Sequence, residues 1–487
     1  MVTLKIPKEV SEISRTLKDA GFEAFVVGGS VRDLLIGRTP SDWDLTTNAT
    51  PEKIQELFPH TFYENEYGTV GVVNDGAIDD TLKNVEVTPY RVESGYSDFR
   101  RPDSVTWGKT VEEDLARRDF TMNAIAYDID TQKLVDPFHG QDDIEKKLIR
   151  TVGKPDERFS EDALRMLRAI RLSATLGFAI EHETQTSIEK NAGLLAHISK
   201  ERIRDEFTKI ILSDAPAPAL DLAARLGVLE HISGEFLKGI GIEQNQAHAY
   251  TVWEHLLRSL QHAADKKYPL HVRISALLHD IAKPHTRKWL NDQWTFYGHE
   301  VVGAKIAKNI LNDLKFSKEI VDKVHRLVRW HMFFSDTEEI SLSAVRRMVR
   351  NVSPELIWDL MDVRAADRIG TGRPKEAPYR LRKYHAMIEE VMRDPISVKQ
   401  LKVNGEDIMQ ITNAPAGPHI GFILEILLSD VLEDPALNTK EYLEARVREL
   451  YALPLEKLSE FGKEARIKNE SEDDKEVEKI KGKHGVQ

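Results

Sequence analysis

Hydrophobic and polar positions follow two different patterns along the chain. Up to about residue 136, short apolar runs rich in β-branched residues alternate with helical stretches, and the runs at 24–27, 70–73 and 84–88 predict strands. Residues 51–57 predict a helix with Thr50 at its N-cap. From about residue 144 onward, Leu, Ile and Ala recur with helical periodicity. The pattern therefore predicts an α+β protein, with an N-terminal α/β head followed by an elongated all-α body.

Chain breakers and composition divide this body further. Stretches rich in proline and glycine at 214–218, 370–374 and 413–418 indicate joints between helices. The last residues are rich in Lys and Glu with almost no large apolar side chains, so we expect a mobile tail. We predict five regions: a head at 1–140, a helical neck at 141–240, a helical domain at 241–390, a C-terminal helical region at 391–462 and the charged tail at 463–487.

The composition excludes several classes of protein. The chain has 68 Lys and Arg against 80 Asp and Glu, a net charge of −12, so a polyanionic partner must be bound locally rather than by overall charge. The absence of cysteine excludes disulfide scaffolds, Cys-ligated metal sites and thiol catalysis, and it favours a reducing cytoplasm. No apolar run approaches the ~18 residues that a membrane span needs. We expect a cytoplasmic protein with no membrane partner.

Two carboxylates stand either side of Trp43. If Asp42 and Asp44 lie on a strand, they project from the same face, and hard oxygen ligands of this kind suit Mg²⁺. An isolated Asp-x-Asp is more often an exposed turn. Glu86 lies between two valines of a predicted strand, so it faces away from them and either completes the metal site or faces solvent.

A glycine pair upstream of these carboxylates favours the metal-binding interpretation. Gly28 and Gly29 join a predicted strand to a helix start, where backbone N–H groups can face a phosphate. Arg32 adds a permanent positive charge to the same segment. We therefore predict that a phosphate cradle and a metal site share one cleft.

A second group of polar residues follows at 161–171, where we predict a helix. Asp162, Arg165 and Arg168 are spaced by three, so they share one helix face. Cytosine and adenine each present an amine donor beside a ring-nitrogen acceptor, which matches an Asp acceptor next to an Arg donor and mismatches guanine and uracil. Asp162 and Arg165 can therefore select C and A without a template. The alternative is a surface helix with ion pairs.

Five motifs occur in a fixed order, and together they resemble a known family. They lie at 28–33, 42–44, 114–124, 136–140 and 161–171. In this order they resemble the bacterial (class II) tRNA nucleotidyltransferases, the CCA-adding enzymes, whose motifs bacterial poly(A) polymerases share. The resemblance implies a polymerase β-like head and template-independent addition or repair of the 3′-terminal CCA of tRNA, using CTP, ATP and Mg²⁺ and releasing pyrophosphate.

The resemblance also implies roles for individual residues. The catalytic, metal-binding residues would be Asp42, Asp44 and Glu86. The nucleotide-binding residues would be Gly28, Gly29, Arg32, Arg117, Arg118, Asp162, Arg165, Arg168 and Arg171. The segment 91–113, which includes Asp98–Pro102, resembles the flexible loop needed for the terminal adenosine and argues against addition of cytidines only.

Histidines and aspartates in the middle of the chain suggest a second metal site. His255, the adjacent pair His279 and Asp280, and Asp367 fall on separate predicted helices, and side chains of both kinds can converge on a divalent transition metal. Their order resembles an HD-type phosphohydrolase domain. We predict that these four residues bind metal. Whether the site hydrolyses phosphate esters or the domain serves only as a scaffold for RNA is left open. Further histidines follow at 299 and 331.

Basic residues form local groups that can follow an RNA backbone. They lie at 100–101, 200–204, 346–350 and 380–383, and solvated helix faces are the alternative for each. We thus expect tRNA as the partner of a CCA-adding enzyme. The alternatives are a poly(A) polymerase or A-only adding enzyme and, from another class, an HD phosphohydrolase with an inert nucleotidyltransferase head.

Overall fold

The computed structural model describes residues 3–63, 68–94, 104–244, 249–290, 292–332 and 340–483. The chain divides into two compact units, Met1–Lys238 with Asp313–Phe316, and Gly239–Asn312 with Ser317–Gln487. The core of the expected flexible loop, 98–102, lies outside the described residues, as do Arg100 and Arg101 of the first basic group. The finer division into five regions stays a prediction.

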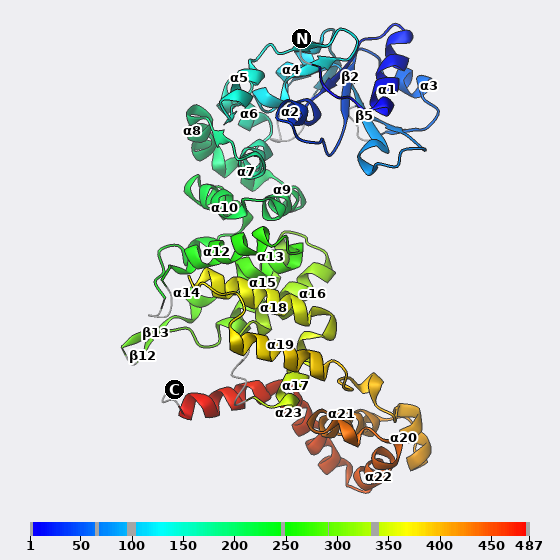
Figure 1. Cartoon of the computed structure of the whole chain (residues 1–487), viewed down its shortest axis with the longest axis vertical. Coiled ribbons are helices and arrows are strands. Elements are labelled where there is room, and N and C mark those ends of the chain that lie inside the picture. Colours follow the sequence, from blue (N-terminus) through cyan, green and yellow to red (C-terminus); the bar gives the residue numbers. More distant parts are fainter. Residues whose placement is uncertain are drawn as a thin grey trace. The chain divides into compact units, whose positions relative to one another are not determined.

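A seven-stranded sheet forms the centre of the head (Figure 1). Its strand order is β3-β4-β5-β2-β1-β8-β9, and β2 and β5 are parallel whereas all other neighbours are antiparallel. The strands are β1 Ala24–Val27, β2 Asp44–Thr47, β3 Thr61–Tyr63, β4 Val70–Val73, β5 Asn84–Pro89, β8 Ala126–Asp128 and β9 Lys133–Val135. The strands expected at 24–27, 70–73 and 84–88 are confirmed. A separate antiparallel pair joins β6 Arg91–Ser94 to β7 Ser104–Trp107.

The head helices surround this sheet. They are α1 Lys8–Asp19, α2 Gly29–Leu35, α3 Pro51–Leu57, α4 Val111–Ala116 and α5 Gly140–Glu145. The expected helix at 51–57 is confirmed, since the side chain of Thr50 accepts a hydrogen bond from the backbone N–H of Lys53. Apolar side chains on one sheet face, including Trp43, Leu45 and Val87, pack into the head core. Strand alternation then directs polar side chains to the opposite face.

Two local expectations for the head are wrong. Asp42 lies in a bend before β2, because the strand begins only at Asp44, after a Pro40-Ser41 segment that favours turns. From the sequence we also expect the segment after Arg117 and Arg118 to continue as a strand over 120–127, but the structure has a 3₁₀ turn there, η2 Thr121–Asn123, followed by the short β8.

Helices build the rest of the first unit. They are α6 Pro155–Glu161, α7 Leu164–Leu176, α8 His182–Asn191, α9 Lys200–Leu212, α10 Pro216–Arg225 and α11 Leu229–Ile232. A short parallel pair, β10 Leu148–Ile149 and β11 Ala179–Ile180, accompanies them. The continuous helix expected at 161–171 is wrong, because Asp162 has extended backbone angles (φ −140°, ψ 102°) and separates α6 from α7.

The second unit is almost entirely helical. Its helices are α12 Val252–Asp265, α13 Leu270–Leu278, α14 Lys283–Thr286, α15 His299–Asp313, α16 Lys318–Trp330, α17 Leu342–Val352, α18 Ile357–Gly370, α19 Tyr379–Val391, α20 Gly405–Thr412, α21 Pro418–Glu433, α22 Lys440–Tyr451 and α23 Leu455–Lys483. One antiparallel hairpin, β12 Lys288–Leu290 with β13 Gln293–Thr295, interrupts them. With β10 and β11, this hairpin makes the expectation of an all-α body too strict.

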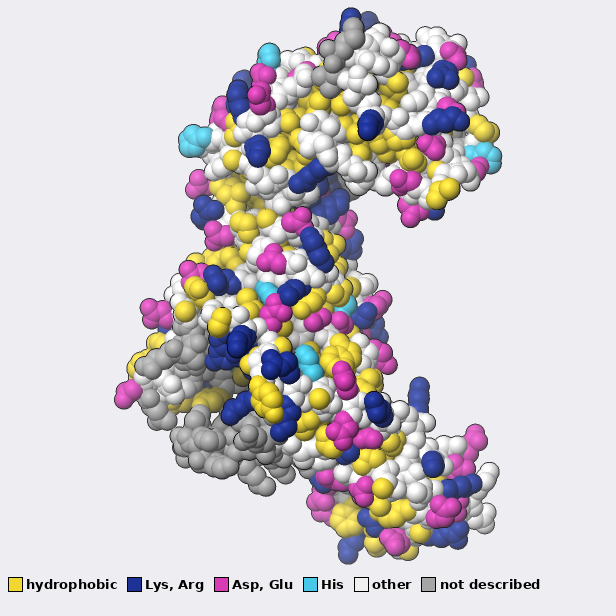
Figure 2. Space-filling model, viewed as in Figure 1, with side chains coloured by type: hydrophobic (Ala, Val, Ile, Leu, Met, Phe, Trp, Pro, Cys, Tyr) yellow, Lys and Arg dark blue, Asp and Glu magenta, His cyan; other side chains and the backbone are white. Residues whose placement is uncertain are grey.

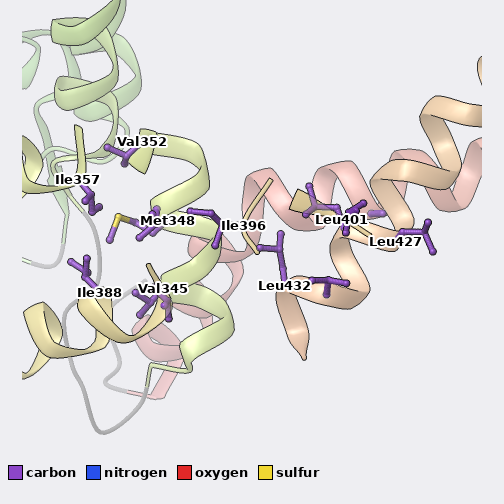
Figure 3. Packing of buried hydrophobic residues seen from close by; sticks show 14 of the residues in the cluster. Val345, Met348, Val352, Ile357, Ile388, Ile396, Leu401, Leu427 and Leu432 are labelled. Carbon is purple, nitrogen blue, oxygen red and sulfur yellow. The ribbon is translucent and has the colours of Figure 1, made fainter. Parts of the chain in front are cut away.

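A continuous apolar core runs through the C-terminal half of this unit (Figure 3). Val345 and Met348 on α17 lie beside Ile388 on α19, and Leu427 and Leu432 on α21 extend the same cluster. The helix α23 packs against α17 and α21, where Ala465 and Asn469 are buried. The residues at 463–469 are therefore part of a packed helix, although we assigned them to the charged tail.

The third basic group is also part of this packing rather than an RNA-facing stripe. Arg346 is buried and donates to Asp394 at 2.7 Å and to the carbonyl of Leu432 at 2.9 Å. Arg347 is buried against Glu433, and Arg350 pairs with Glu425 at 3.1 Å. Because their charges are used between helices, the expectation that this group contacts RNA is wrong.

Candidate functional site

The sheet places Asp44 and Glu86 next to each other. They are directly paired across the parallel strands β2 and β5, and both are partly exposed on the face opposite Leu45 and Val87. Of the two interpretations left open for Glu86, this register favours the one in which it joins the Asp44 site. Asp42 lies on the exposed bend two residues earlier. Among the described residues, the three carboxylates do not form a compact cluster with oxygens within 4.8 Å of one another.

The glycine turn lies against this carboxylate pair. Gly28 has a positive φ of 77°, and a Cβ added there would come within 2.9 Å of Arg118 Nη1 and 3.3 Å of Asp44 Oδ2. The guanidinium of Arg118 and the carboxylate of Asp44 therefore both border the turn. Only glycine combines this backbone angle with this close approach. The phosphate cradle and the carboxylates expected in one cleft are thus brought together.

Buried acceptors hold the arginines of the head in place. Asp114 is fully buried and accepts from Arg117 Nε at 2.8 Å and from Arg118 Nη2 at 3.1 Å. Burial alone would raise the pKa of Asp114, but the two guanidinium groups outweigh it and keep that pKa below its ordinary value. Arg32 donates to Asp33 and, at 2.7 Å, to Asn123 Oδ1. These arginines are oriented before any anion binds.

The break between α6 and α7 shapes a second polar group. Asp162 Oδ1 accepts from the backbone N–H of Leu164 at 3.1 Å, and Arg202 on α9 reaches both carboxylate oxygens, at 3.2 and 2.8 Å. Arg165 Nη1 donates to Glu161 at 2.6 Å, and its Nη2 donates to the carbonyl of Arg117 at 3.0 Å. Each base-selecting side chain predicted from the sequence is therefore held by its own partner.

Two further arginines of the predicted set lie on α7. Arg168 Nη2 lies 3.1 Å from Asp119 Oδ2, and Arg171 Nε donates to Glu206 Oε2 at 2.6 Å. Asp119 and Glu206 are buried, so these charges are paired within the first unit. Sequence reasoning missed Asp114, Arg202 and Glu206 as partners. Asp114 opens one of the five motifs, and Arg202 belongs to the basic group at 200–204.

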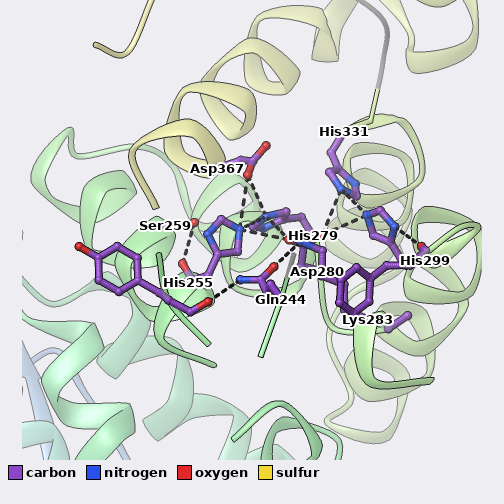
Figure 4. Close-up of polar contacts among 12 residues, drawn as sticks. Gln244, His255, Ser259, His279, Asp280, Lys283, His299, His331 and Asp367 are labelled. Carbon is purple, nitrogen blue, oxygen red and sulfur yellow. Dashed lines mark hydrogen bonds and ion pairs between the residues drawn. The ribbon is translucent and has the colours of Figure 1, made fainter. Parts of the chain in front are cut away.

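The second unit contains a compact cluster of imidazoles and carboxylates (Figure 4). The four predicted ligands are buried and come together, and His255 Nε2 lies 3.1 Å from Asp280 Oδ2 and 3.4 Å from Asp367 Oδ1. His279 Nε2 lies 3.3 Å from Asp280 Oδ2 and 2.9 Å from His255 Nε2. Ligand atoms from α12, α18 and the end of α13 thus point at one small volume.

The other oxygen of Asp280 faces two histidines that sequence reasoning did not assign as ligands. His299 Nε2 lies 3.1 Å and His331 Nε2 3.6 Å from Asp280 Oδ1, and all three side chains are buried. Figure 4 shows Asp280 between this pair and the first group. The signal in the sequence was the presence of histidines at 299 and 331, but their convergence on Asp280 depends on tertiary packing.

Backbone carbonyls determine which imidazole nitrogen faces the cluster. Nδ1 of His279, His299 and His331 lies 2.9, 2.7 and 2.7 Å from the carbonyls of Ala276, Phe296 and Val328. A carbonyl can only accept, so each Nδ1 carries a proton and each Nε2 presents its lone pair unless the ring is charged. His299 Nε2 and His331 Nε2 are 3.3 Å apart, a geometry that a shared cation stabilises.

The electrostatics of the cluster follow from burial and the two aspartates. Burial lowers the pKa of His331 to about 4, so this ring is neutral. Burial also opposes charge on His279, but Asp280 and Asp367 outweigh it and raise the pKa of His279 to about 10. Lys283 Nζ lies 2.5 Å from Asp280 Oδ2 and donates to Gln244 at 2.6 Å. The positive charges of His279 and Lys283 thus offset those of Asp280 and Asp367, and a bound cation would take the place of the proton on His279.

Together the two units define a class of protein: a nucleotidyltransferase head followed by a helical HD domain. Residues 24–150 match the family "Poly A polymerase head domain", 177–237 match "Probable RNA and SrmB-binding site of polymerase A", and 248–371 match "HD domain". The CCA-adding enzyme of Geobacillus kaustophilus is 37% identical over 440 residues, covering 90% of this chain and 95% of the relative. That of Geobacillus stearothermophilus is 35% identical over 449 residues, covering 91% and 96%. The chain belongs to the CCA-adding enzyme family.

Solved structures confirm the expected fold. The crystal structure of the Bacillus stearothermophilus CCA-adding enzyme in complex with CTP superposes with a TM-score of 0.68 at 29% identity, covering 91% of this chain and 98% of that one. The expectation of a polymerase β-like head and a largely helical body is confirmed. Among the residues described here, no helix combines the length and the apolar character that crossing a membrane requires.

Proposed function

We propose that this enzyme builds and repairs the 3′-terminal CCA of tRNA from CTP and ATP. The observation that carries the proposal is the assembly of Asp44, Glu86, Gly28 and Arg118 at the central strands β1, β2 and β5 of the sheet. Relatives that the chain matches over nearly their whole length are CCA-adding enzymes, and one of them binds CTP in a crystal. The RNA 3′-hydroxyl attacks the α-phosphate of the nucleotide and pyrophosphate leaves, so no protein nucleophile is needed.

The carboxylates on and next to these central strands fit a divalent cation. CCA-adding enzymes are nucleotidyltransferases, and this family uses divalent metal ions. The hard carboxylate oxygens of Asp42, Asp44 and Glu86 suit Mg²⁺. When bound, Mg²⁺ would neutralise charge on the triphosphate and lower the pKa of the attacking hydroxyl. Arg118, held by Asp114 beside the glycine turn, supplies a fixed positive charge for phosphate oxygens.

This function can be tested with tRNA substrates whose 3′ ends are shortened by a known number of nucleotides. Purified full-length protein is given tRNA lacking one, two or all three terminal nucleotides, with labelled CTP and ATP. We expect addition of A, CA and CCA respectively, followed by arrest. The runner-up functions predict different products, since a poly(A) polymerase adds many A residues and an A-only enzyme adds no C. Either of those results, or no addition at all, would reject the proposal.

Asp162 and Arg165 are the proposed base-selecting pair. Arg202 and the Leu164 N–H hold the Asp162 carboxylate, and Glu161 holds Arg165. In Asp162→Ala the amine of C or A loses its acceptor, so we expect the preference for CTP and ATP over UTP and GTP to fall by about 10- to 100-fold. Single-turnover incorporation of each nucleotide measures this ratio.

A matched control comes from the same part of the chain. Asp205 on α9 is exposed and bonds its neighbour Arg204, so Asp205→Ala also removes an arginine-paired carboxylate of the neck. We expect Asp205→Ala to keep the preference of the original protein. Equal preferences in Asp162→Ala and Asp205→Ala would show that Asp162 does not select the base.

The carboxylate of Asp280 favours a second function, because its two oxygens face two different groups of histidines. We propose that the HD domain binds two divalent cations, one at His255, His279, Asp280 and Asp367 and one at Asp280, His299 and His331. The facing Nε2 atoms and buried carboxylates fit such ions, and imidazole ligands favour transition metals. When bound, two cations would polarise a phosphate ester for hydrolysis by water. Lys283, which contacts Asp280 Oδ2 at 2.5 Å, would add a positive charge beside the bound phosphate.

A further inference from the structure

The hairpin formed by β12 and β13 carries two tryptophans, of which Trp289 is exposed and Trp294 is half-buried. Trp289 and Trp294 are direct cross-strand partners, so they lie on the same face, and their ring centroids are 5.0 Å apart at 74°. The Trp289 residue is 55% exposed. The guanidinium of Arg287 lies 3.6 Å from the centroid of the Trp294 ring. This trio forms an aromatic and cationic surface, which we call the tryptophan hairpin.

Other apolar side chains beside Trp289 are exposed as well. Leu290 and Tyr297, next to the hairpin strands, are also 46% and 43% exposed. Adjacent exposed apolar side chains are a feature of binding surfaces. A two-stranded hairpin with three-residue strands is marginally stable on its own, so the ring pair and the cation–π contact hold its shape.

Both ends of the tryptophan hairpin connect directly to the proposed metal cluster. Before β12 comes α14, whose first residue, Lys283, contacts Asp280. After β13 comes Phe296, whose carbonyl accepts from His299 Nδ1 at 2.7 Å and from Thr286 Oγ1 at 3.4 Å. At a strand rise of about 3.3 Å per residue, Trp294 lies roughly 7 Å along the backbone from Phe296. That span is comparable with one nucleotide.

We propose that the tryptophan hairpin stacks the bases of a single-stranded RNA 3′ end whose terminal phosphate enters the HD cluster. This inference rests on the second proposed function and names its substrate class. Aromatic faces stack any base, and Arg287 with the exposed Lys288 complements the charge of the RNA backbone. Duplex RNA keeps its bases paired and offers no free face to the rings.

The proposed reaction is hydrolysis of a 3′-phosphomonoester. The oxygen of water bonds to phosphorus, and the bond between phosphorus and the ribose 3′-oxygen breaks. One proton of the water ends on that ribose oxygen and the other stays with the released phosphate. The RNA then carries the free 3′-hydroxyl that nucleotide addition requires.

The test compares two substrates in the full-length protein loaded with Mn²⁺. One is a six-nucleotide single-stranded RNA with a 3′-phosphate, and the other is glycerol 2-phosphate, a phosphomonoester that has no aromatic ring to stack on a tryptophan. In Trp289→Ala and Trp294→Ala we expect the KM for the RNA to rise about tenfold or more, with glycerol 2-phosphate hydrolysis unchanged. Trp358→Ala, which removes a 40% exposed tryptophan of α18, is the matched control and should change neither.

The outcomes separate the two proposals. Equal RNA kinetics in the hairpin variants and in Trp358→Ala overturn the stacking surface, as does a change of oligomeric state confined to the hairpin variants. If the protein hydrolyses neither substrate, the second function fails, and the affinity of the labelled RNA decides the stacking surface alone. A tenfold weaker affinity in Trp294→Ala than in Trp358→Ala then supports it, and equal affinities overturn it.

Discussion

Replacing Asp44 by alanine should slow nucleotide addition by roughly 10³-fold or more, because a metal ligand contributes several kcal/mol of transition-state stabilisation. Asp44 begins β2, pairs directly with Glu86 and has its Oδ2 3.3 Å from the position that a Cβ on Gly28 would occupy. Binding of tRNA should stay nearly unchanged, since a broad RNA surface does not depend on one carboxylate. Rapid-quench incorporation and a filter-binding assay measure the two effects separately.

Three further variants make this test specific. Asp75→Ala removes an exposed carboxylate of the same head, at 65% side-chain exposure, and should leave the rate unchanged. Asp42→Ala should abolish addition as Asp44→Ala does, and Glu86→Gln distinguishes a metal-site carboxylate from a solvent-facing one. Full activity in Asp44→Ala or Asp42→Ala would remove these residues from the catalytic site.

The distribution of positive charge explains how an acidic chain can act on RNA. On the face shown in Figure 2, Lys and Arg side chains are interspersed with Asp and Glu over both units. The arginines of the head are different, because Asp114 and Asn123 hold them around the glycine turn. A net charge of −12 therefore does not prevent anion binding where arginines and metal ions act locally.

Local patterns predicted the head well but could not predict its long-range pairings. The valines either side of Glu86 indicated which way its side chain points, and the structure agrees. That β5 pairs in parallel with β2, which brings Glu86 beside Asp44, depends on contacts between strands about 40 residues apart. The expected helix at 161–171 failed for a local reason, because the Asp162 side chain bonds the Leu164 N–H and competes with helical hydrogen bonding.

In the HD domain too, the sequence predicted some features of the site and not others. The order of histidine and aspartate residues predicted four ligands that the structure brings together. The order of these residues does not indicate which side chains face Asp280 Oδ1, so His299 and His331 were not assigned as ligands. The tryptophan hairpin was missed because its strands have three residues each and lack a buried face of alternating apolar residues. An Asn-Asp pair between two short aromatic runs was the available signal.

Metal content should distinguish a two-ion HD site from a one-ion site. After dialysis against Mn²⁺ and removal of free metal, we expect two ions per HD domain, and about one fewer in His299→Ala, which leaves the ligands of the first group intact. Asp280→Ala should lose both ions, because its two oxygens face the two groups of histidines at 3.1 to 3.6 Å. Mass spectrometry of the metal measures this without reference to activity. Each count is made in an Asp44→Ala background, so that Mn²⁺ bound at the head carboxylates is not counted with that of the HD domain.

His325→Ala is the matched control for this measurement. His325 lies on α16 and is half-buried, but it belongs to neither group of converging ligand atoms, so its loss should leave two ions bound. Circular dichroism checks that each variant keeps its helices. A single ion in the original protein that survives in His299→Ala would limit the site to the four ligands predicted from the sequence. No bound ion in any variant would instead make the domain a scaffold, and Asp280 would then act through its contacts with Lys283 and the neighbouring imidazoles.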